Sequence, residues 1–239
     1  MKALFDLHTH TIGSGHAFST IKENIEEAQK IGLKVLGSSD HAPAMPGAFH
    51  EFYLGNCKVI PKQMGDLRVL WGTEVNVLDY DGKIDMEEKL LRKMDYVIAS
   101  LHPHICIQPG TIEENTRAVI NVMDNPYVKI IGHPDDDRIP VDLEKVVQAA
   151  VEKKVVLEVN NSSLNPLASR QGGKKNIMEL LRLAKEYHAY IIMGTDSHIC
   201  YQIGKFEDAE AALNEADFPD ELVLNYDLDK LKLVLNKEF

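Results

Sequence analysis

Short apolar runs alternate along the chain with longer stretches that have helical periodicity. This alternation is typical of strand-helix units repeated around a mainly parallel sheet, because parallel strands are buried on both faces. We therefore predict an α/β fold with seven strands. The strands are expected at residues 3–7, 34–38, 68–72, 96–100, 128–132, 155–159 and 190–194.

Amphipathic stretches between these runs predict the helices. They are expected at residues 20–31, 86–93, 112–123, 143–153, 176–187 and 206–214. Ser19 or Thr20 can cap the first helix, with Glu23 completing a capping box, and Asp142 can cap the fourth. Asp227 can cap a last helix that runs through Leu235.

No stretch of the sequence has the composition of a linker, a solenoid repeat or a low-complexity tract. The longest irregular segments, residues 42–54 and 160–173, carry Gly, Pro, Ser or Asn and are expected to form loops over a site. We therefore predict one domain over residues 1–239.

The chain has 37 acidic and 26 basic residues and a formal net charge of -11. This charge repels polyanions, so nucleic-acid binding is not expected. Bound divalent cations are outside that count, and three of them would add about six positive charges at one spot. An acidic surface is thus compatible with a site that attracts phosphate.

Cys57, Cys106 and Cys200 are scattered and form no CxxC pair, so we expect buried free thiols rather than disulfides or a thiolate metal site. Lys2 and Asp6 interrupt the apolar start of the chain, and no long apolar span follows. We expect a soluble, cytoplasmic protein without a membrane partner.

Most of the ten histidines follow the carboxyl ends of the predicted strands, where parallel sheets and barrels hold their ligands. His8 and His10 follow the first strand, and their H-x-H spacing in extended chain points both rings to one face. A lone histidine after a strand is most often structural. Recurrence at successive strand ends instead predicts metal binding.

Similar residues follow the other strands. His41 follows the second strand, Glu74 the third, His102 the fourth and His133 the fifth, while Asp196 and His198 follow the last. His16 lies in a glycine-containing loop that can fold back towards the same rim. His104 could face the site or fill the wall.

Imidazole and carboxylate groups bind zinc, manganese or iron, and the absence of thiolate favours a catalytic over a structural site. One tetrahedral zinc ion takes four ligands. The nine candidates therefore imply two or three ions, with Glu74 as the natural bridging ligand. They are His8, His10, His16, His41, Glu74, His102, His133, Asp196 and His198.

These motifs together resemble the PHP superfamily, named for polymerase and histidinol phosphatase, and especially its YcdX-like single-domain phosphatases. The resemblance covers nearly the whole chain. It rests on His8-Thr9-His10, Ser39-Asp40-His41, Glu74 after Trp71-Gly72-Thr73, His102, Gly132-His133-Pro134, Glu158-Val159-Asn160-Asn161-Ser162-Ser163 and Gly194-Thr195-Asp196-Ser197-His198.

The resemblance implies a distorted (β/α)7 TIM-like barrel with three metal ions, most readily zinc, with manganese or iron as alternatives. One ion would be held by His8, His10, Glu74 and Asp196. A second would be held by Glu74, His102 and His133, and a third by His16, His41 and His198.

The expected activity is hydrolysis of a small phosphate ester by a metal-bound hydroxide, since a metal lowers the pKa of bound water towards roughly 7. Besides Glu74 and Asp196, two residues are candidates for catalysis. Asp40 would orient His41 or a water molecule, and Arg170 would clamp the phosphate.

Two other functions stay open. An amidohydrolase-like barrel that cleaves C–N or lactone bonds also uses H-x-H on its first strand, but it leaves His16, His41 and His198 without a role. A metal-binding regulatory protein with little turnover would keep the same ligands. Neither a G-x-S-x-G elbow nor a phosphate-binding P-loop is present. The substrate could be a sugar phosphate, a nucleotide, histidinol phosphate or a small phosphodiester. The sequence does not decide whether the protein forms a homo-oligomer.

Overall fold

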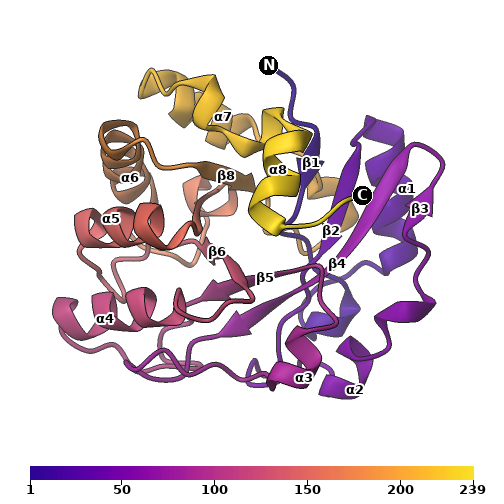
Figure 1. The fold of residues 1–239 in the computed structure, drawn as a ribbon, viewed down its shortest axis with the longest axis horizontal. Coiled ribbons are helices and arrows are strands. Elements are labelled where there is room, and N and C mark those ends of the chain that lie inside the picture. Colours follow the sequence, from indigo (N-terminus) through magenta and orange to yellow (C-terminus); the bar gives the residue numbers. More distant parts are fainter.

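Seven parallel strands form the central sheet of the computed structural model, which describes residues 1–239 (Figure 1). Neighbouring strands pair in the order β1-β2-β4-β5-β6-β7-β8 and curl into a nearly closed barrel. The predicted α/β fold and its seven strands are confirmed. Their bounds are β1 (Phe5–Asp6), β2 (Val35–Ser38), β4 (Leu67–Asn76), β5 (Tyr96–Ser100), β6 (Val128–Gly132), β7 (Val156–Asn160) and β8 (Ile191–Gly194).

The region around β4 differs from the prediction in two ways. A short additional strand, β3 (Gln63–Met64), pairs antiparallel with the start of β4. β4 itself runs on to Asn76, so Glu74 lies within the strand. The sequence pattern had placed Glu74 after the end of the strand. The extra length brings Glu74 and Asn76 to one face at the barrel rim, since side chains in a strand alternate.

Long helices cover the outside of the barrel (Figure 1). The caps predicted at Thr20, Asp142 and Asp227 are confirmed, and Thr20 and Glu23 form the expected capping box. The long helices are α1 (Ile21–Ile31), α4 (Ile112–Val122), α5 (Leu143–Lys153), α6 (Gly173–Tyr187), α7 (Glu207–Glu215) and α8 (Leu228–Leu235). Single 3-10 turns lie at Ile12–Ser14, Cys57–Val59, Ser162–Leu164, Cys200–Gln202, Asp220–Leu222 and Leu224–Tyr226.

The helices on either side of β4 are reduced to one turn, α2 (Glu51–Leu54) and α3 (Glu88–Leu91). The prediction of a helix over residues 86–93 is thus wrong in length. Before it, Asp85 accepts hydrogen bonds from Asn76 N (2.8 Å) and Ala44 N (2.8 Å). These bonds hold the preceding chain at the rim, and the helix begins only after Glu87, its N-cap.

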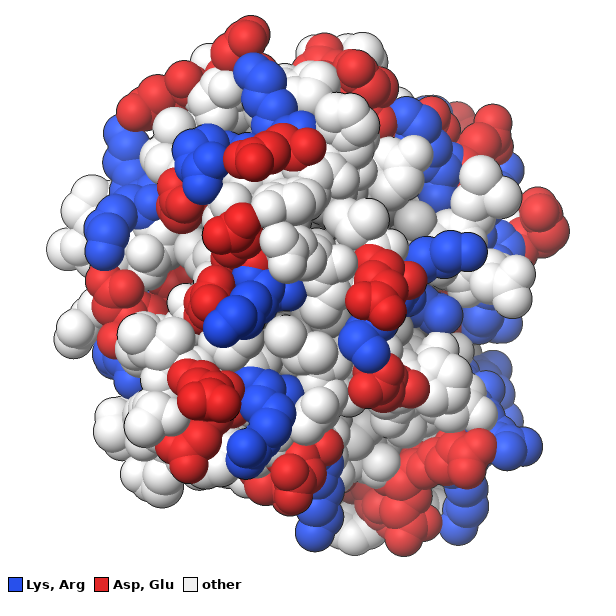
Figure 2. All heavy atoms as spheres, turned by 60° about the vertical axis from the view of Figure 1, so that its left-hand side comes forward, with Lys and Arg blue, Asp and Glu red and all other residues white.

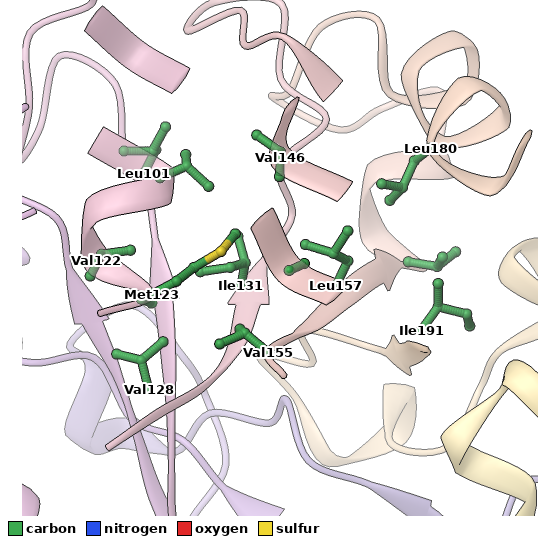
Figure 3. Packing of buried hydrophobic residues seen from close by; sticks show 14 of the residues in the cluster. Leu101, Val122, Met123, Val128, Ile131, Val146, Val155, Leu157, Leu180 and Ile191 are labelled. Atoms are coloured by element: carbon green, nitrogen blue, oxygen red, sulfur yellow. The ribbon is translucent and has the colours of Figure 1, made fainter. Parts of the chain in front are cut away.

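Two apolar layers stabilise the barrel. One lies between the outer face of the sheet and the helices, where Leu157 and Ile191 pack towards Val146 of α5 and Leu180 of α6 (Figure 3). The other fills the barrel at the amino ends of the strands, where Phe5 meets residues of α8 such as Leu231. Both ends of the chain therefore contribute to one interior.

The junction between β1 and β8 is closed by the side chain of Asn225. Its Nδ2 donates to Phe5 O (3.1 Å) on β1 and Met193 O (2.9 Å) on β8, while its Oδ1 accepts from Met193 N (2.7 Å). Its backbone carbonyl accepts from Leu4 N at 2.8 Å. The fully buried Asn225 thus joins the two strands at this end of the junction, while backbone bonds from Ser197 N to His8 O and from His10 N to Ser197 O join them towards the rim.

Acidic and basic side chains are interspersed over the face that carries α4, α5 and α6 (Figure 2). Pairs such as Lys145 with Asp142 and Arg182 with Glu179 connect them. This face therefore presents no extended field of one sign to a polyanion. No helix is both long and apolar enough to cross a lipid bilayer.

Replacing Asn225 with alanine is expected to lower the free energy of unfolding by about 2–4 kcal/mol. The change leaves one buried N–H and two buried carbonyls without their partner, and each such loss typically costs about 1–3 kcal/mol before relaxation. Urea titration followed by circular dichroism measures this. Asn214→Ala, at an exposed position of α7, is the control and should change stability by less than about 0.5 kcal/mol. Equal stability of both variants would show that Asn225 does not close the barrel.

Candidate metal centre

The histidines predicted to converge do so at the carboxyl ends of the strands. They lie in and below a cleft of about 490 Å³. The cleft is lined by His16, His41, Met45, Pro46, Leu101, His102, Pro103, Ile105, His133, Asp136, Arg138, Ser162, Ala168, Ser169, Arg170, Asp196 and His198. His8, His10 and Glu74 are fully buried beneath it.

Glu74 is the centre of the cluster. Its Oε1 lies 3.0 Å from His133 Nε2 and 3.4 Å from His102 Nε2. Its Oε2 lies 2.7 Å from His41 Nδ1, 3.5 Å from His8 Nε2 and 3.6 Å from His10 Nε2. One carboxylate thus contacts five imidazoles that come from four strands.

Asp196 is the second carboxylate in contact with the histidine cluster. Its Oδ1 lies 3.1 Å from His10 Nε2 and 3.5 Å from His8 Nε2, while Arg170 Nη2 donates to its Oδ2 at 2.6 Å. The backbone of Asp196 has a left-handed φ of 53°, and that of His133 a φ of 29°. Non-glycine residues rarely adopt such angles, and sites of function are where the cost is most often accepted.

The outer edge of the cluster is formed by His16, His41 and His198. The ring of His16 lies 5.1 Å from that of His41 and 4.6 Å from that of His198, measured between centroids. His10 lies below them, with its ring 4.4 Å from the rings of both His41 and His198. His104, whose role the sequence left open, is exposed and belongs to none of these groups.

Four ligand trios can be drawn in which all ligand atoms lie within 4.8 Å of one another. They are His8/His10/Asp196, His8/Glu74/His133, His41/Glu74/His102 and His10/His41/His198. Because they share members, the set offers more than one ion position. His16 is in none of the trios and reaches the cluster only through its ring contacts.

Several of the potential ligand atoms are placed to bind metal ions and make no hydrogen bonds with one another. His8 Nε2, His10 Nε2, His41 Nδ1, Glu74 Oε2 and His198 Nε2 are buried without any hydrogen-bond partner. Such atoms are costly unless a cation satisfies them. Two ligands about 2.0–2.1 Å from a tetrahedral zinc ion are roughly 3.4 Å apart, close to the 3.1–3.6 Å found between several of these pairs.

Hydrogen bonds at Nδ1 leave Nε2 of four histidines free for a metal. His8 Nδ1 lies 2.6 Å from Glu158 Oε1, and His102 Nδ1 lies 2.7 Å from Asn76 Oδ1. His198 Nδ1 donates to the carbonyl of Asp196 (2.9 Å), and His10 Nδ1 lies 2.9 Å from Ser14 Oγ. Each acceptor fixes the ring tautomer, as acceptors behind metal-bound histidines usually do.

Three of these supporting residues were missed by sequence reasoning: Ser14, Asn76 and Glu158. A signal existed for two of them, because Asn76 lies two residues after Glu74 on the same face of β4, and Glu158 begins a motif at the end of β7. Glu158 also needs Gly194 beside it, since a Cβ there would lie 1.9 Å from Glu158 Oε1. Nothing in the sequence around Ser14 indicated its role.

Asp40, which the sequence suggested orients His41 or a water molecule, reaches the cluster through Ser14. Ser14 Oγ donates to Asp40 Oδ1 (2.7 Å), so the same Oγ must accept from His10 Nδ1 at 2.9 Å. Thr11 Oγ1 and Tyr53 OH also donate to Asp40, at 2.6 and 3.0 Å. Ser14 Oγ also accepts from His41 N at 3.1 Å, so Asp40 acts through Ser14 both on the ring of His10 and on the backbone of His41.

The charges within the cluster keep its carboxylates ionised. Burial alone would raise the pKa of Glu74, but His41, His8 and His102 hold it well below its usual range. The pKa of Asp196 is likewise lowered against the effect of burial, by His8 and Arg170. Both groups are therefore acceptors suited to a cation.

The cysteines take no part in the cluster. All three are free, as expected, but only Cys200 is buried, while Cys57 and Cys106 are half-buried. Cys57 lies in the 3-10 turn after the short helix α2, and none of the three residues of that turn is buried. The prediction of three buried thiols is thus wrong for two of them.

Known proteins share the sequence or the fold of this chain. A probable phosphatase of Clostridium novyi (strain NT) is 48% identical over 238 residues, which cover 100% of this chain and 96% of that protein. The crystal structure of histidinol phosphate phosphatase from Lactococcus lactis, complexed with zinc, L-histidinol and phosphate, superposes with a TM-score of 0.63 at 18% identity, covering 92% of this chain and 95% of that one. An amidohydrolase II structure superposes with a TM-score of 0.53 at 14% identity, covering 98% and 100%.

The two structural likenesses show a shared barrel and do not separate the activities. The sequence comparisons are more specific. The PHP domain profile matches residues 6–162, from the end of β1 to the loop after β7. The chain therefore belongs to the PHP domain family.

Proposed function

We propose that this protein is a metal-dependent phosphatase that hydrolyses small phosphate esters at a site of three metal ions, most readily zinc. The observation that carries the proposal is the set of buried, unpartnered nitrogen and oxygen atoms around Glu74, directly beneath a cleft that also holds Arg170. The name of the full-length relative from Clostridium novyi, a probable phosphatase, agrees with it.

The donors of the site are imidazole and carboxylate, which suit zinc, with manganese or iron as alternatives. One ion would be held by His8, His10, Glu74 and Asp196, a second by Glu74, His102 and His133, and a third by His16, His41 and His198. The overlap of the ligand trios through Glu74, His8, His10 and His41 supports more than one ion. When bound, such ions acidify a water molecule and neutralise phosphoryl oxygens.

The chain's own residues would orient the substrate. Arg170 is mostly buried, with 14% of its side chain exposed, and donates to Asp196, Asn160 and Ser163. These contacts fix the guanidinium at the cleft wall, where its remaining N–H groups can bind phosphoryl oxygens. Leu101 and Ile105 supply apolar lining that limits water beside the phosphoryl group.

Glu74→Gln is expected to reduce bound zinc from about three ions per chain and to reduce turnover of p-nitrophenyl phosphate at least 100-fold. The amide keeps the size of the side chain but removes the charge that faces five imidazoles. Metal analysis by mass spectrometry and a colorimetric assay measure the two effects.

Glu152→Gln, at an exposed position of α5, is the matched control and should retain both metal and turnover. One ion or none in the wild type would rule out the trinuclear site. Full zinc content and activity in Glu74→Gln would rule out Glu74 as a bridging ligand.

Glu158→Gln is expected to weaken zinc binding about 10- to 100-fold, the usual effect of removing the hydrogen-bond partner of a metal-bound histidine. Glu158 accepts from His8 on one oxygen and from His133 N (2.9 Å) and Asn160 Nδ2 (3.0 Å) on the other. An amide must turn its NH2 group towards one of these donors. Competition with a chromophoric chelator measures the affinity, and unchanged affinity would show that Glu158 does not tune the metal site.

Arg170→Met is expected to raise the inhibition constant of inorganic phosphate about 30-fold or more, equivalent to roughly 2 kcal/mol for a charge-assisted contact. The inhibition is measured with p-nitrophenyl phosphate as substrate at saturating zinc, since Arg170 also contacts Asp196. Arg170→Lys keeps the positive charge but loses the two parallel N–H donors of the guanidinium. Its inhibition constant should lie between those of the wild type and Arg170→Met. An unchanged inhibition constant in Arg170→Met would exclude the phosphate contact.

A further inference from the structure

A second arginine, Arg138, lines the same cleft. It lies in the loop after β6, and 30% of its side chain is exposed. Its Nε donates to both oxygens of Asp136, at 3.0 and 2.9 Å, and its Nη2 donates to Asp136 Oδ2 at 2.6 Å. The metal-centre proposal leaves this residue without a role.

The pairing with Asp136 uses only one edge of the guanidinium. An arginine side chain has five N–H bonds, and those of Nε and one of Nη2 point to Asp136. Nη1 has no acceptor in the protein among the hydrogen bonds of Arg138. The edge formed by Nη1 and the remaining Nη2 hydrogen is therefore free for a second planar or tetrahedral anion.

Asp136 holds Arg138 in a fixed place. Besides the guanidinium, Asp136 Oδ1 accepts from Arg138 N (3.0 Å) and from Gln171 N (3.2 Å). Gln171 O in turn accepts from Asp137 N at 2.8 Å. The loops after β6 and β7 are thus tied together, and the free edge of Arg138 needs little ordering when a ligand binds.

The rest of the cleft suits a substrate with two polar ends. Met45, Pro46, Leu101, Pro103 and Ile105 form apolar lining that fits a carbon skeleton. The acidic groups of the lining, Asp136 and Asp196, are each paired with an arginine. Both carboxylates that line the cleft are therefore at least partly neutralised by an arginine.

We propose that Arg138 binds a second anionic group, a carboxylate or a phosphate, on the leaving group of the substrate. The proposal rests on the phosphatase function and narrows its substrate to phosphomonoesters of anionic alcohols. Arg138 is then a specificity residue, while the loop tie through Asp136 positions it.

The test compares pairs of substrates that differ in the second anionic group. Glycerol 3-phosphate is paired with 3-phosphoglycerate, and fructose 6-phosphate with fructose 1,6-bisphosphate. The wild type should prefer the member that carries the second anionic group in at least one pair, by 10-fold or more in kcat/KM. In Arg138→Met this preference should fall about 10-fold or more, and Arg138→Lys should retain part of it. The pair that responds shows whether a carboxylate or a phosphate is bound.

A second measurement needs no variant. Phosphonoacetate, 3-phosphonopropionate and 4-phosphonobutyrate are compared with alkylphosphonates of equal length as inhibitors of p-nitrophenyl phosphate hydrolysis by the wild type. At least one carboxylated inhibitor should bind 10-fold more tightly than its alkyl counterpart.

Equal inhibition throughout, or a substrate preference that Arg138→Met leaves intact, overturns the role of Arg138 while the phosphatase function stands. Absence of any hydrolysis, including that of p-nitrophenyl phosphate, overturns the proposed function and this inference with it.

Discussion

The carboxylate of Glu74 has no access to solvent and lies within 3.6 Å of five imidazole nitrogen atoms. An isolated anion in such a place is very costly. Acceptors behind several of the rings fix which nitrogen carries the proton and leave the other nitrogen facing the carboxylates. Bound cations would satisfy both these nitrogen lone pairs and the charges of Glu74 and Asp196. The barrel makes this possible because parallel strands deliver their carboxyl ends to one rim. Much of the remaining architecture, from Glu158 and Asn76 to Asp40 and Ser14, holds these rings in place.

Much of the fold could be predicted because it follows from the periodicity of apolar residues and from the order of the apolar runs along the chain. Seven apolar runs of strand length, separated by amphipathic stretches, leave few arrangements other than a parallel sheet with outer helices. The local exceptions depend on particular hydrogen bonds. Asp85 binds back to Asn76 and Ala44 and holds the chain before α3 at the rim. The junction between β1 and β8 depends on Asn225, a single polar residue in a 3-10 turn that has no periodicity to reveal it.

At the site, the sequence indicated the nine side chains that the structure brings together, because all but His16 lie at or just after the carboxyl end of a strand and His16 lies in a glycine-containing loop beside them. Their roles as ligands, and the number of ions, stay predictions. The supporting contacts were harder to foresee, since a hydrogen bond between His10 and Ser14 depends on how a loop folds back. Arg138 was missed for a different reason. An arginine two residues after an aspartate resembles a solvated surface turn, and only the structure shows that the pair lines the cleft.

The closure at Asn225 has a consequence for how the protein is made. Asp6 and Thr195, which bond to each other across the same junction, are 189 residues apart in sequence. The two strands that flank it can meet only when nearly the whole chain has left the ribosome, because synthesis proceeds from the amino end. His8 and His10 emerge first and Asp196 emerges near the end. The nine side chains proposed as ligands can therefore come together only after His198, the last of them, has left the ribosome.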